Sequence, residues 1–216
     1  MREYITYEWF TLFTIFGIVA VAAAKYMNTS RFSDFIYVIG NSKYLKIYSK
    51  DQKFIDLFDG LLFFNLVCSS SIFIFFGYST FVSEQSFELV PFLKLLFTVS
   101  TIIIIKILLE RLIGSLFEID SIIDDYLFQK TTFKNYSGLI FLAANLTLLY
   151  TDYDAKIIII AVISVICLIN LIGFIASFKT HQKTINSSLF YFLLYLCALE
   201  IAPYVLLYKV ISEYNV

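Results

Sequence analysis

Long apolar segments separated by short polar ones constrain this sequence more than any other feature. A helix needs about 20 mostly apolar residues to cross the hydrocarbon core of a bilayer. Windows of that size predict six spans, at residues 9–26, 57–78, 92–113, 137–150, 156–178 and 189–210. Hydrophobic residues make up 60% of the chain, whereas soluble domains contain about 45–50%, so too few polar side chains remain to cover a water-soluble globule. We therefore predict an all-α fold, a polytopic transmembrane helix bundle of six spans in one domain.

The fourth segment, 137–150, is the weakest of the six. It is short, and only Asp152 and Asp154 interrupt the apolar sequence before the fifth segment begins. The two segments are predicted to form a helical hairpin. A fourth segment that only dips into the membrane, which would leave five spans, is the alternative.

The distribution of Lys and Arg predicts the orientation of these spans. Most of the basic residues lie in the first, third and fifth loops, within the stretches 25–53, 111–134 and 179–183. Cytoplasmic loops carry an excess of Lys and Arg. These three loops are therefore predicted to be cytoplasmic, and the amino and carboxyl termini are predicted to lie together on the opposite side.

The first loop interleaves basic and aromatic residues beside the membrane. Asn28, Thr29 or Ser30 is expected to cap a short helix there, around residues 32–39. Four lysines are expected to contact lipid headgroups, namely Lys43, Lys46, Lys50 and Lys53. Aromatic rings in such loops lie at the interface and ammonium groups lie among lipid phosphates. Docking of a cytoplasmic partner or a phosphorylated ligand is the alternative interpretation.

Residues 112–129, in the third loop, have the pattern of an amphipathic helix. Apolar residues recur at helical spacing. Acidic residues occupy the opposite face, namely Glu118, Asp120, Asp124 and Asp125. We predict that the third helix continues beyond the membrane as a cytoplasmic amphipathic extension, with Gly114 as the point where it bends. Because anionic lipid repels an acidic face, the extension either packs against the basic first loop or docks another protein.

Three ionisable residues, Lys106, Glu110 and Arg111, lie within or at the end of the third span. Such residues are costly at membrane depth and mark candidate functional sites. Lys106 and Glu110 are one helical turn apart and are placed to pair within the helix. The long side chain of Lys106 can also reach the predicted cytoplasmic boundary. The group is therefore either a local anchor or part of a functional site.

Glu200 lies deeper in the membrane, in the last predicted span, three residues before Pro203. A carboxylate is too short to reach the surface from that depth, and proline interrupts the hydrogen bonds of the helix. An acid beside a broken helix suits proton or ion handling. It equally suits a structural acid, either hydrogen-bonded to a neighbouring helix or paired with Lys94 or Lys106.

No catalytic, cofactor or metal motif is present in the sequence. Walker, GxGxxG, HExxH and GxSxG patterns are absent, and the cysteines and the single histidine are not clustered, so we expect no cofactor and no metal. Asp56-Leu57-Phe58-Asp59-Gly60 matches the opening of an intramembrane phosphatidyltransferase signature. The residues that should follow are missing, and we interpret the match as chance. The net charge of −1 gives no indication of nucleic-acid binding.

Two further segments carry a family resemblance. The stretch Phe190–Lys209, FYFLLYLCALEIAPYVLLYK, and the loop Asn41-Ser42-Lys43-Tyr44 resemble an uncharacterised six-helix inner-membrane family of the Bacteroidota, a domain of unknown function. The resemblance covers most of the chain. It implies a Gram-negative inner membrane with periplasmic termini, and it implies no activity and no catalytic residues.

These observations favour a non-enzymatic integral inner-membrane subunit that assembles with a larger complex, of which the secretion and gliding machinery of that phylum is an example. The expected partners are the lipid bilayer and other membrane subunits, with no nucleic acid. A small proton- or ion-coupled carrier using Glu200 and the Lys106/Glu110 pair is the alternative. A membrane enzyme acting on a lipid is a third hypothesis with no motif behind it.

Overall fold

The computed structural model describes residues 8–41, 43–49, 56–83, 87–116 and 120–181. These ranges contain helices and their connections, with no strand among them. The helices are α1 (Glu8–Met27), α2 (Thr29–Ile36), α3 (Lys43–Tyr48), α4 (Leu57–Phe81), α5 (Leu89–Leu116), α6 (Asp120–Tyr150) and α7 (Ala155–His181).

Four helices of the described part, α1, α4, α5 and α7, are long and apolar enough to cross a membrane. The predicted fourth span, 137–150, is the second half of α6, whose 31 residues begin with a polar stretch. The all-helical fold predicted from the sequence is thus confirmed, with four candidate membrane spans. The predicted sixth span, 189–210, lies outside the described residues, and the count of six stays a prediction.

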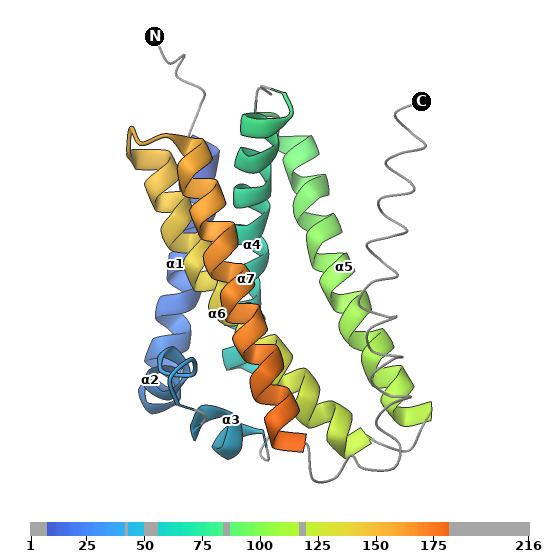
Figure 1. Cartoon of the computed structure of the whole chain (residues 1–216). Helices are drawn as coiled ribbons and strands as arrows, with labels where there is room; N and C mark the ends of the chain where they lie inside the picture. Colours follow the sequence, from blue (N-terminus) through green and yellow to red (C-terminus); the bar gives the residue numbers. More distant parts are fainter. Residues whose placement is uncertain (1–7, 42, 50–55, 84–86, 117–119, 182–216) are drawn as a thin grey trace.

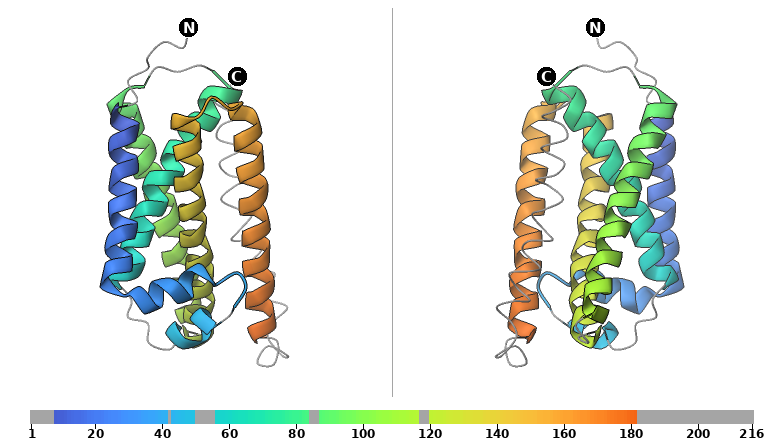
Figure 2. Two further views of the ribbon diagram at one scale, coloured as in Figure 1. Left: turned by 90° about the vertical axis from the view of Figure 1, so that its left-hand side faces the viewer. Right: turned by 90° about the vertical axis from the view of Figure 1, so that its right-hand side faces the viewer.

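α4 and α6 form the centre of the bundle (Figure 1). α1 packs along α4, and α7 packs along α6, as the two side views also show (Figure 2). In the most apolar stretch of α4, 56% of the residues are buried, whereas in that of α5 only 6% are. α5 is therefore a peripheral helix, and α2 and α3 lie across the end of the bundle where α5 ends and α6 begins.

The predicted extension of the third helix is wrong in its connectivity. α5 ends at Leu116, and the amphipathic residues that follow begin a separate helix, α6. A Cβ atom on Gly114 would lie 2.8 Å from a side-chain carbon of Ile123. In one continuous helix these two residues would be about 13 Å apart, so the chain has reversed. Gly114 is therefore the position where α6 approaches α5 closely. The sequence does not reveal the reversal, because apolar residues recur at helical spacing both in one continuous helix and in two successive helices.

Small and polar residues hold α1 and α6 against α4. A Cβ on Gly17 of α1 would lie 2.9 Å from Asn65 Oδ1, and a Cβ on Gly138 of α6 would lie 2.9 Å from the Leu66 Cα atom. The buried amide of Asn145 in α6 donates to the Ser69 carbonyl of α4 at 2.8 Å. Small residues and interhelical hydrogen bonds are the usual means by which membrane helices associate, because lipid removes most of the hydrophobic driving force.

An aromatic cluster joins the start of α5 to the rest of the bundle. The fully buried ring of Phe92 lies 5.6 Å from that of Phe10 in α1 and 6.4 Å from that of Phe75 in α4. Such edge-to-face contacts add to the burial of the rings. α5 is thus attached to α1 and α4 near its first residues by aromatic contacts. Near its other end it forms ion pairs with α6, which are described below.

Candidate functional site

Arg31 of α2 is the centre of an ionic cluster at the end of the bundle. Its Nη1 donates to Asp56 Oδ2, and its Nη2 donates to Asp59 Oδ2 at 2.8 Å. Its Nε donates to the hydroxyl of Tyr44 at 3.4 Å. Only 11% of the Arg31 side chain is exposed. One guanidinium therefore ties α2 and α3 to the first turn of α4.

Aromatic rings surround this guanidinium. The Arg31 Cζ atom lies 4.4 Å from the ring centroid of Phe58 and 5.2 Å from that of Tyr48. Tyr44, which binds Arg31, also stacks on Phe128 of α6, with ring centroids 5.6 Å apart and planes inclined by 18°. Guanidinium groups are favourable over aromatic faces, most of all where water is excluded. The cluster thus connects four helices.

Local sequence explains how these side chains are placed. Asn28 caps α2, since its side chain accepts a hydrogen bond from the Arg31 backbone N–H at 3.0 Å. This confirms one of the three predicted caps, although α2 begins earlier than predicted. Asp56 caps α4 by accepting from the Phe58 N–H at 3.2 Å. An N-cap residue uses one carboxylate oxygen for the backbone, which leaves the other oxygen of Asp56 for Arg31.

The electrostatics of the cluster favour one protonation state for each of Arg31, Tyr44 and Asp56. Burial opposes the charged form of Arg31, but Tyr44, the Asp59 charge and the hydrogen bond to Asp56 raise its pKa. Burial and the Asp59 charge raise the pKa of Tyr44. Burial disfavours ionised Asp56, yet hydrogen bonds from Arg31 and from the Phe58 backbone lower its pKa. Near neutral pH the cluster therefore holds a cation, a neutral phenol and an ionised Asp56.

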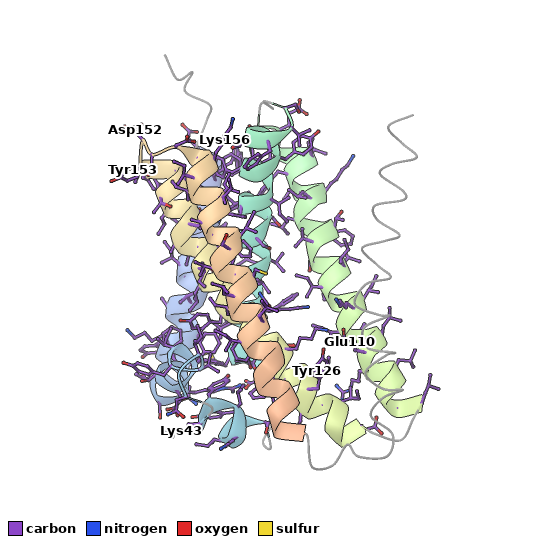
Figure 3. The ribbon with its side chains drawn as sticks, in the orientation of Figure 1. Lys43, Glu110, Tyr126, Asp152, Tyr153 and Lys156 are labelled. Atoms are coloured by element: carbon purple, nitrogen blue, oxygen red, sulfur yellow. The ribbon has the colours of Figure 1, made fainter. Side chains whose placement is uncertain are left out.

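A second ionic group joins α5 to α6. Lys130 Nζ donates to Glu110 Oε1 at 2.6 Å, and it lies 5.2 Å from the ring centroid of Tyr126. Only 1% of the Glu110 side chain is exposed, and Figure 3 shows it directed from α5 toward α6. Arg111 pairs with Asp124 of α6 at 3.6 Å. The far end of α5 is therefore held by two interhelical ion pairs.

A cleft of about 490 Å³ lies between these two ionic groups, bounded by α4, α5 and α6. Asp56 and Asp59 line it from α4, Arg111 from α5 and Asp124 from α6. The remaining walls are largely apolar side chains. The cleft is thus a partly apolar space with several charges at its edge. Within the described part of the chain, no group of three or more His, Cys, Asp or Glu side chains is placed to hold a metal ion.

A family model matches residues 10–211, nearly the whole chain. It is the model of the Domain of unknown function (DUF4271). The chain belongs to this family. The comparison with curated proteins and the comparison with solved structures each gave no match.

The structure places the predicted site residues of this DUF4271 chain in different surroundings. Glu110 and Arg111 belong to the ion pairs described above, and Lys106, which is half-buried, precedes them on α5. The predicted pair of Lys106 with Glu110 stays a prediction, while the hydrogen bond shown for Glu110 comes from another helix, at Lys130. Glu200 and Pro203 lie outside the described residues.

The residues predicted to meet lipid or protein also differ in their surroundings. Lys43 is exposed and pairs with Asp34 at 3.1 Å, and Lys46 is exposed. Asp120 is exposed and Asp125 is half-buried on α6. Three further residues of the predicted sites lie outside the described ranges, namely Lys50, Lys53 and Glu118.

Sequence reasoning missed the Arg31 cluster in this DUF4271 chain. Asp56 and Asp59 were noticed only as a chance motif match, and the structure shows both of them bound to Arg31. Two acids at the start of an apolar helix, one at its cap and one in its first turn, require a counter-charge when they are buried. That requirement, together with the basic loop just before Asp56, is the feature of the sequence that could have indicated a cation paired with the two acids.

Proposed function

We propose that this chain is a non-enzymatic integral inner-membrane subunit that assembles with a larger membrane complex, with its termini in the periplasm. The observation that carries the proposal is the placement of the first turns of α6. Their apolar face is already covered by the chain itself: Ile107 of α5 packs against Ile123 and its neighbours, and Tyr44 stacks on Phe128. Asp120, the first residue of α6, is left exposed.

This arrangement suits a docking surface for another protein. Asp120 is exposed and Asp125 is half-buried, whereas Asp124 pairs with Arg111 of the same chain. A helix held firmly on one side presents its charges at low entropic cost, which favours recognition of a basic partner. We therefore assign docking to Asp120 and Asp125, and an internal role to Asp124.

The ionic groups of the described part support the same proposal. Arg31, Glu110 and Arg111 each pair with a side chain on another helix. Charges used in this way hold helices in register and orientation, which is a structural role. An assembly subunit requires a rigid scaffold and an outward surface, and these residues supply the scaffold.

Co-purification tests the proposal. The tagged full chain is expressed in its native host, extracted in mild detergent and compared with a variant carrying Asp120→Lys and Asp125→Lys. We expect the unaltered chain to retain a stoichiometric partner and the variant to lose about tenfold of it, because like charges brought together across an interface cost more than the 1.4 kcal/mol that a factor of ten requires. Glu88→Lys, at an exposed position before α5, is the matched control and should retain the partner.

Two results would count against an assembly role. One is an unaltered chain that runs alone in mild detergent. The other is a partner that the doubly substituted chain retains in full, which would place docking elsewhere on the molecule.

The second candidate function is a small proton- or ion-coupled carrier, and the observation that favours it is the burial of Glu110. Its Oε2 atom is buried and has no hydrogen-bond partner among the described residues. A carboxylate in an apolar span is a candidate relay for protons or ions. In vesicles containing the full chain and a pH-sensitive dye, Glu110→Gln and Glu200→Gln should each abolish ion-dependent proton movement. Equal rates in the unaltered and Gln chains would remove the carrier hypothesis.

A further inference from the structure

The cleft between α4, α5 and α6 combines a charged end with apolar walls. Its charged end is formed by Asp56, Asp59, Arg111 and Asp124. Along α5, Leu108 and Ile104 continue the lining away from Arg111. At about 1.5 Å per residue, Ile104 lies roughly 10 Å deeper along the helix than Arg111. The cleft is therefore charged at one end, and its other walls are mostly apolar, with Thr131 and Thr132 among them.

The charged end of the cleft lies near the ends of the helices that form it. Asp56 precedes the first residue of α4, and Asp59 belongs to its first turn. Arg111 is in the last turns of α5, and Asp124 is in the first turns of α6. Asp56, Asp59 and Arg111 are therefore near the ends of two helices that are apolar enough to cross a membrane, and Asp124 is in the polar first half of α6.

The balance of charge selects the kind of headgroup. Asp56 and Asp59 share the single guanidinium of Arg31, and Asp124 faces Arg111 at 3.6 Å, longer than a hydrogen bond. Three carboxylates thus line this edge of the cleft, and the ion pairs described for them involve two guanidinium groups. An ammonium group with N–H donors compensates such an excess, and a nearby phosphate is compatible with Arg111.

We infer that the cleft binds a zwitterionic phospholipid whose headgroup carries a primary amine. The ammonium lies between Asp59 and Asp124, the phosphate lies toward Arg111, and the acyl chains follow Leu108 and Ile104 into the bilayer. Anionic lipid is disfavoured by the carboxylates, and a trimethylammonium headgroup offers no N–H donor to them. The volume of about 490 Å³ is within the range of about 300–1,000 Å³ that is usual for small-molecule sites. This inference does not depend on the proposed assembly role.

Gly60 gives a way to close the cleft without disturbing the packing. It lines the cleft, and a Cβ atom placed on it would have no atom within 4 Å. A phenylalanine at this position therefore displaces no packed neighbour, and its ring can occupy the space that the lipid would use. Gly77, on the same helix, is equally unobstructed and is not a cleft residue. Gly77→Phe is thus a matched control for Gly60→Phe.

The experiment is a lipid titration of the delipidated full chain, followed by native mass spectrometry. The probes are phosphatidylethanolamine, phosphatidylglycerol and phosphatidylcholine with identical acyl chains, and soluble glycerophosphoethanolamine. We expect phosphatidylethanolamine to bind the unaltered chain and Gly77→Phe about tenfold more tightly than the other two lipids, and about tenfold more tightly than it binds Gly60→Phe. Soluble glycerophosphoethanolamine should bind at least about a hundredfold more weakly, because it lacks the apolar part.

Three results would overturn the inference. They are equal affinity for phosphatidylglycerol, unchanged binding of phosphatidylethanolamine by Gly60→Phe, and binding of the soluble headgroup as tightly as the lipid. Should Gly60→Phe fail to elute as a folded species, Asp124→Asn decides the matter. That substitution keeps the size of the side chain and removes its charge, so the preference for phosphatidylethanolamine should fall severalfold, and an unchanged preference refutes the assignment.

Discussion

Replacing Arg31 with methionine tests the structural role of the ionic cluster most directly. Methionine keeps an unbranched apolar side chain among the rings of Phe58 and Tyr48, so the change removes mainly the charge and its hydrogen bonds. Asp56 and Asp59 then share an apolar site without a counter-charge. Their side chains are 33% and 20% exposed, and that of Arg31 only 11%.

The expected loss follows from this burial. Removing one partner of a buried ion pair costs about 3–5 kcal/mol. Because water reaches Asp56, we take the lower end, about 3 kcal/mol, for Arg31→Met. The pair of Lys43 with Asp34, whose lysine is 56% exposed, is the internal control. An exposed pair contributes about 0–1 kcal/mol, so Lys43→Met should have little effect.

Thermal unfolding of the full chain in detergent, followed by circular dichroism, measures both variants. For chains of this length, 1 kcal/mol corresponds to about 2–4 °C in Tm. Arg31→Met should therefore lower the Tm by about 6–12 °C, and Lys43→Met by less than about 4 °C. Equal shifts in the two variants would refute the argument that burial of the guanidinium sets its contribution.

The pH dependence of the same difference checks its electrostatic origin. The fold lowers the pKa of Asp56 from 3.8, because the hydrogen bonds from Arg31 and from the Phe58 backbone outweigh the opposing effect of burial. A carboxylate with a lowered pKa stabilises the fold above its unfolded pKa, and this contribution is lost as the pH falls through the folded pKa. Without Arg31 the two carboxyl groups are buried without a counter-charge, so they bind protons at a higher pH than they do in the unaltered chain. The Tm difference between the unaltered chain and Arg31→Met should therefore already shrink above about pH 4 as the pH falls. A difference that stays constant from about pH 8 to pH 4 would argue against an electrostatic origin.

Three further contacts between helices are probed by substitution, each measured as a change in Tm. Gly138→Ala places a Cβ 2.9 Å from a backbone atom of α4 and should destabilise the fold by about 1–3 kcal/mol, whereas Gly77→Ala, which meets nothing, should be neutral or stabilising. Lys130→Met leaves the buried carboxylate of Glu110 without its hydrogen-bonded cation and should cost about 3 kcal/mol; adding Glu110→Gln should restore part of that loss, and no restoration would argue against the pair. Asn145→Leu removes a hydrogen bond to a carbonyl of α4 and should cost about 0.5–2 kcal/mol; a fully stable variant would show that the bond contributes nothing.

The candidate site was only partly predictable, and particular residues show why. Glu110 and Arg111 stand out in the sequence because charges in an apolar span are conspicuous. Their partners do not, since Lys130 is 20 residues away from Glu110 on a different helix. The same limit applies to Arg31, which is separated from Asp56 and Asp59 by 25 and 28 residues. Helical spacing identifies neighbours three or four residues apart and says nothing about these contacts.

What the sequence by itself determined is local: the apolar length of α1, α4, α5 and α7, and the presence of a helix cap within residues 28–30. These features depend on residues adjacent in the chain, because a helix satisfies its own backbone hydrogen bonds and its apolar length alone decides whether it suits a bilayer. The tertiary structure alone decided that the chain reverses after Leu116, that Ile123 packs on Gly114, and which charges meet around the cleft. Those outcomes depend on how helices far apart in the sequence pack together, and the energy of a buried charge is set by the partner that this packing supplies.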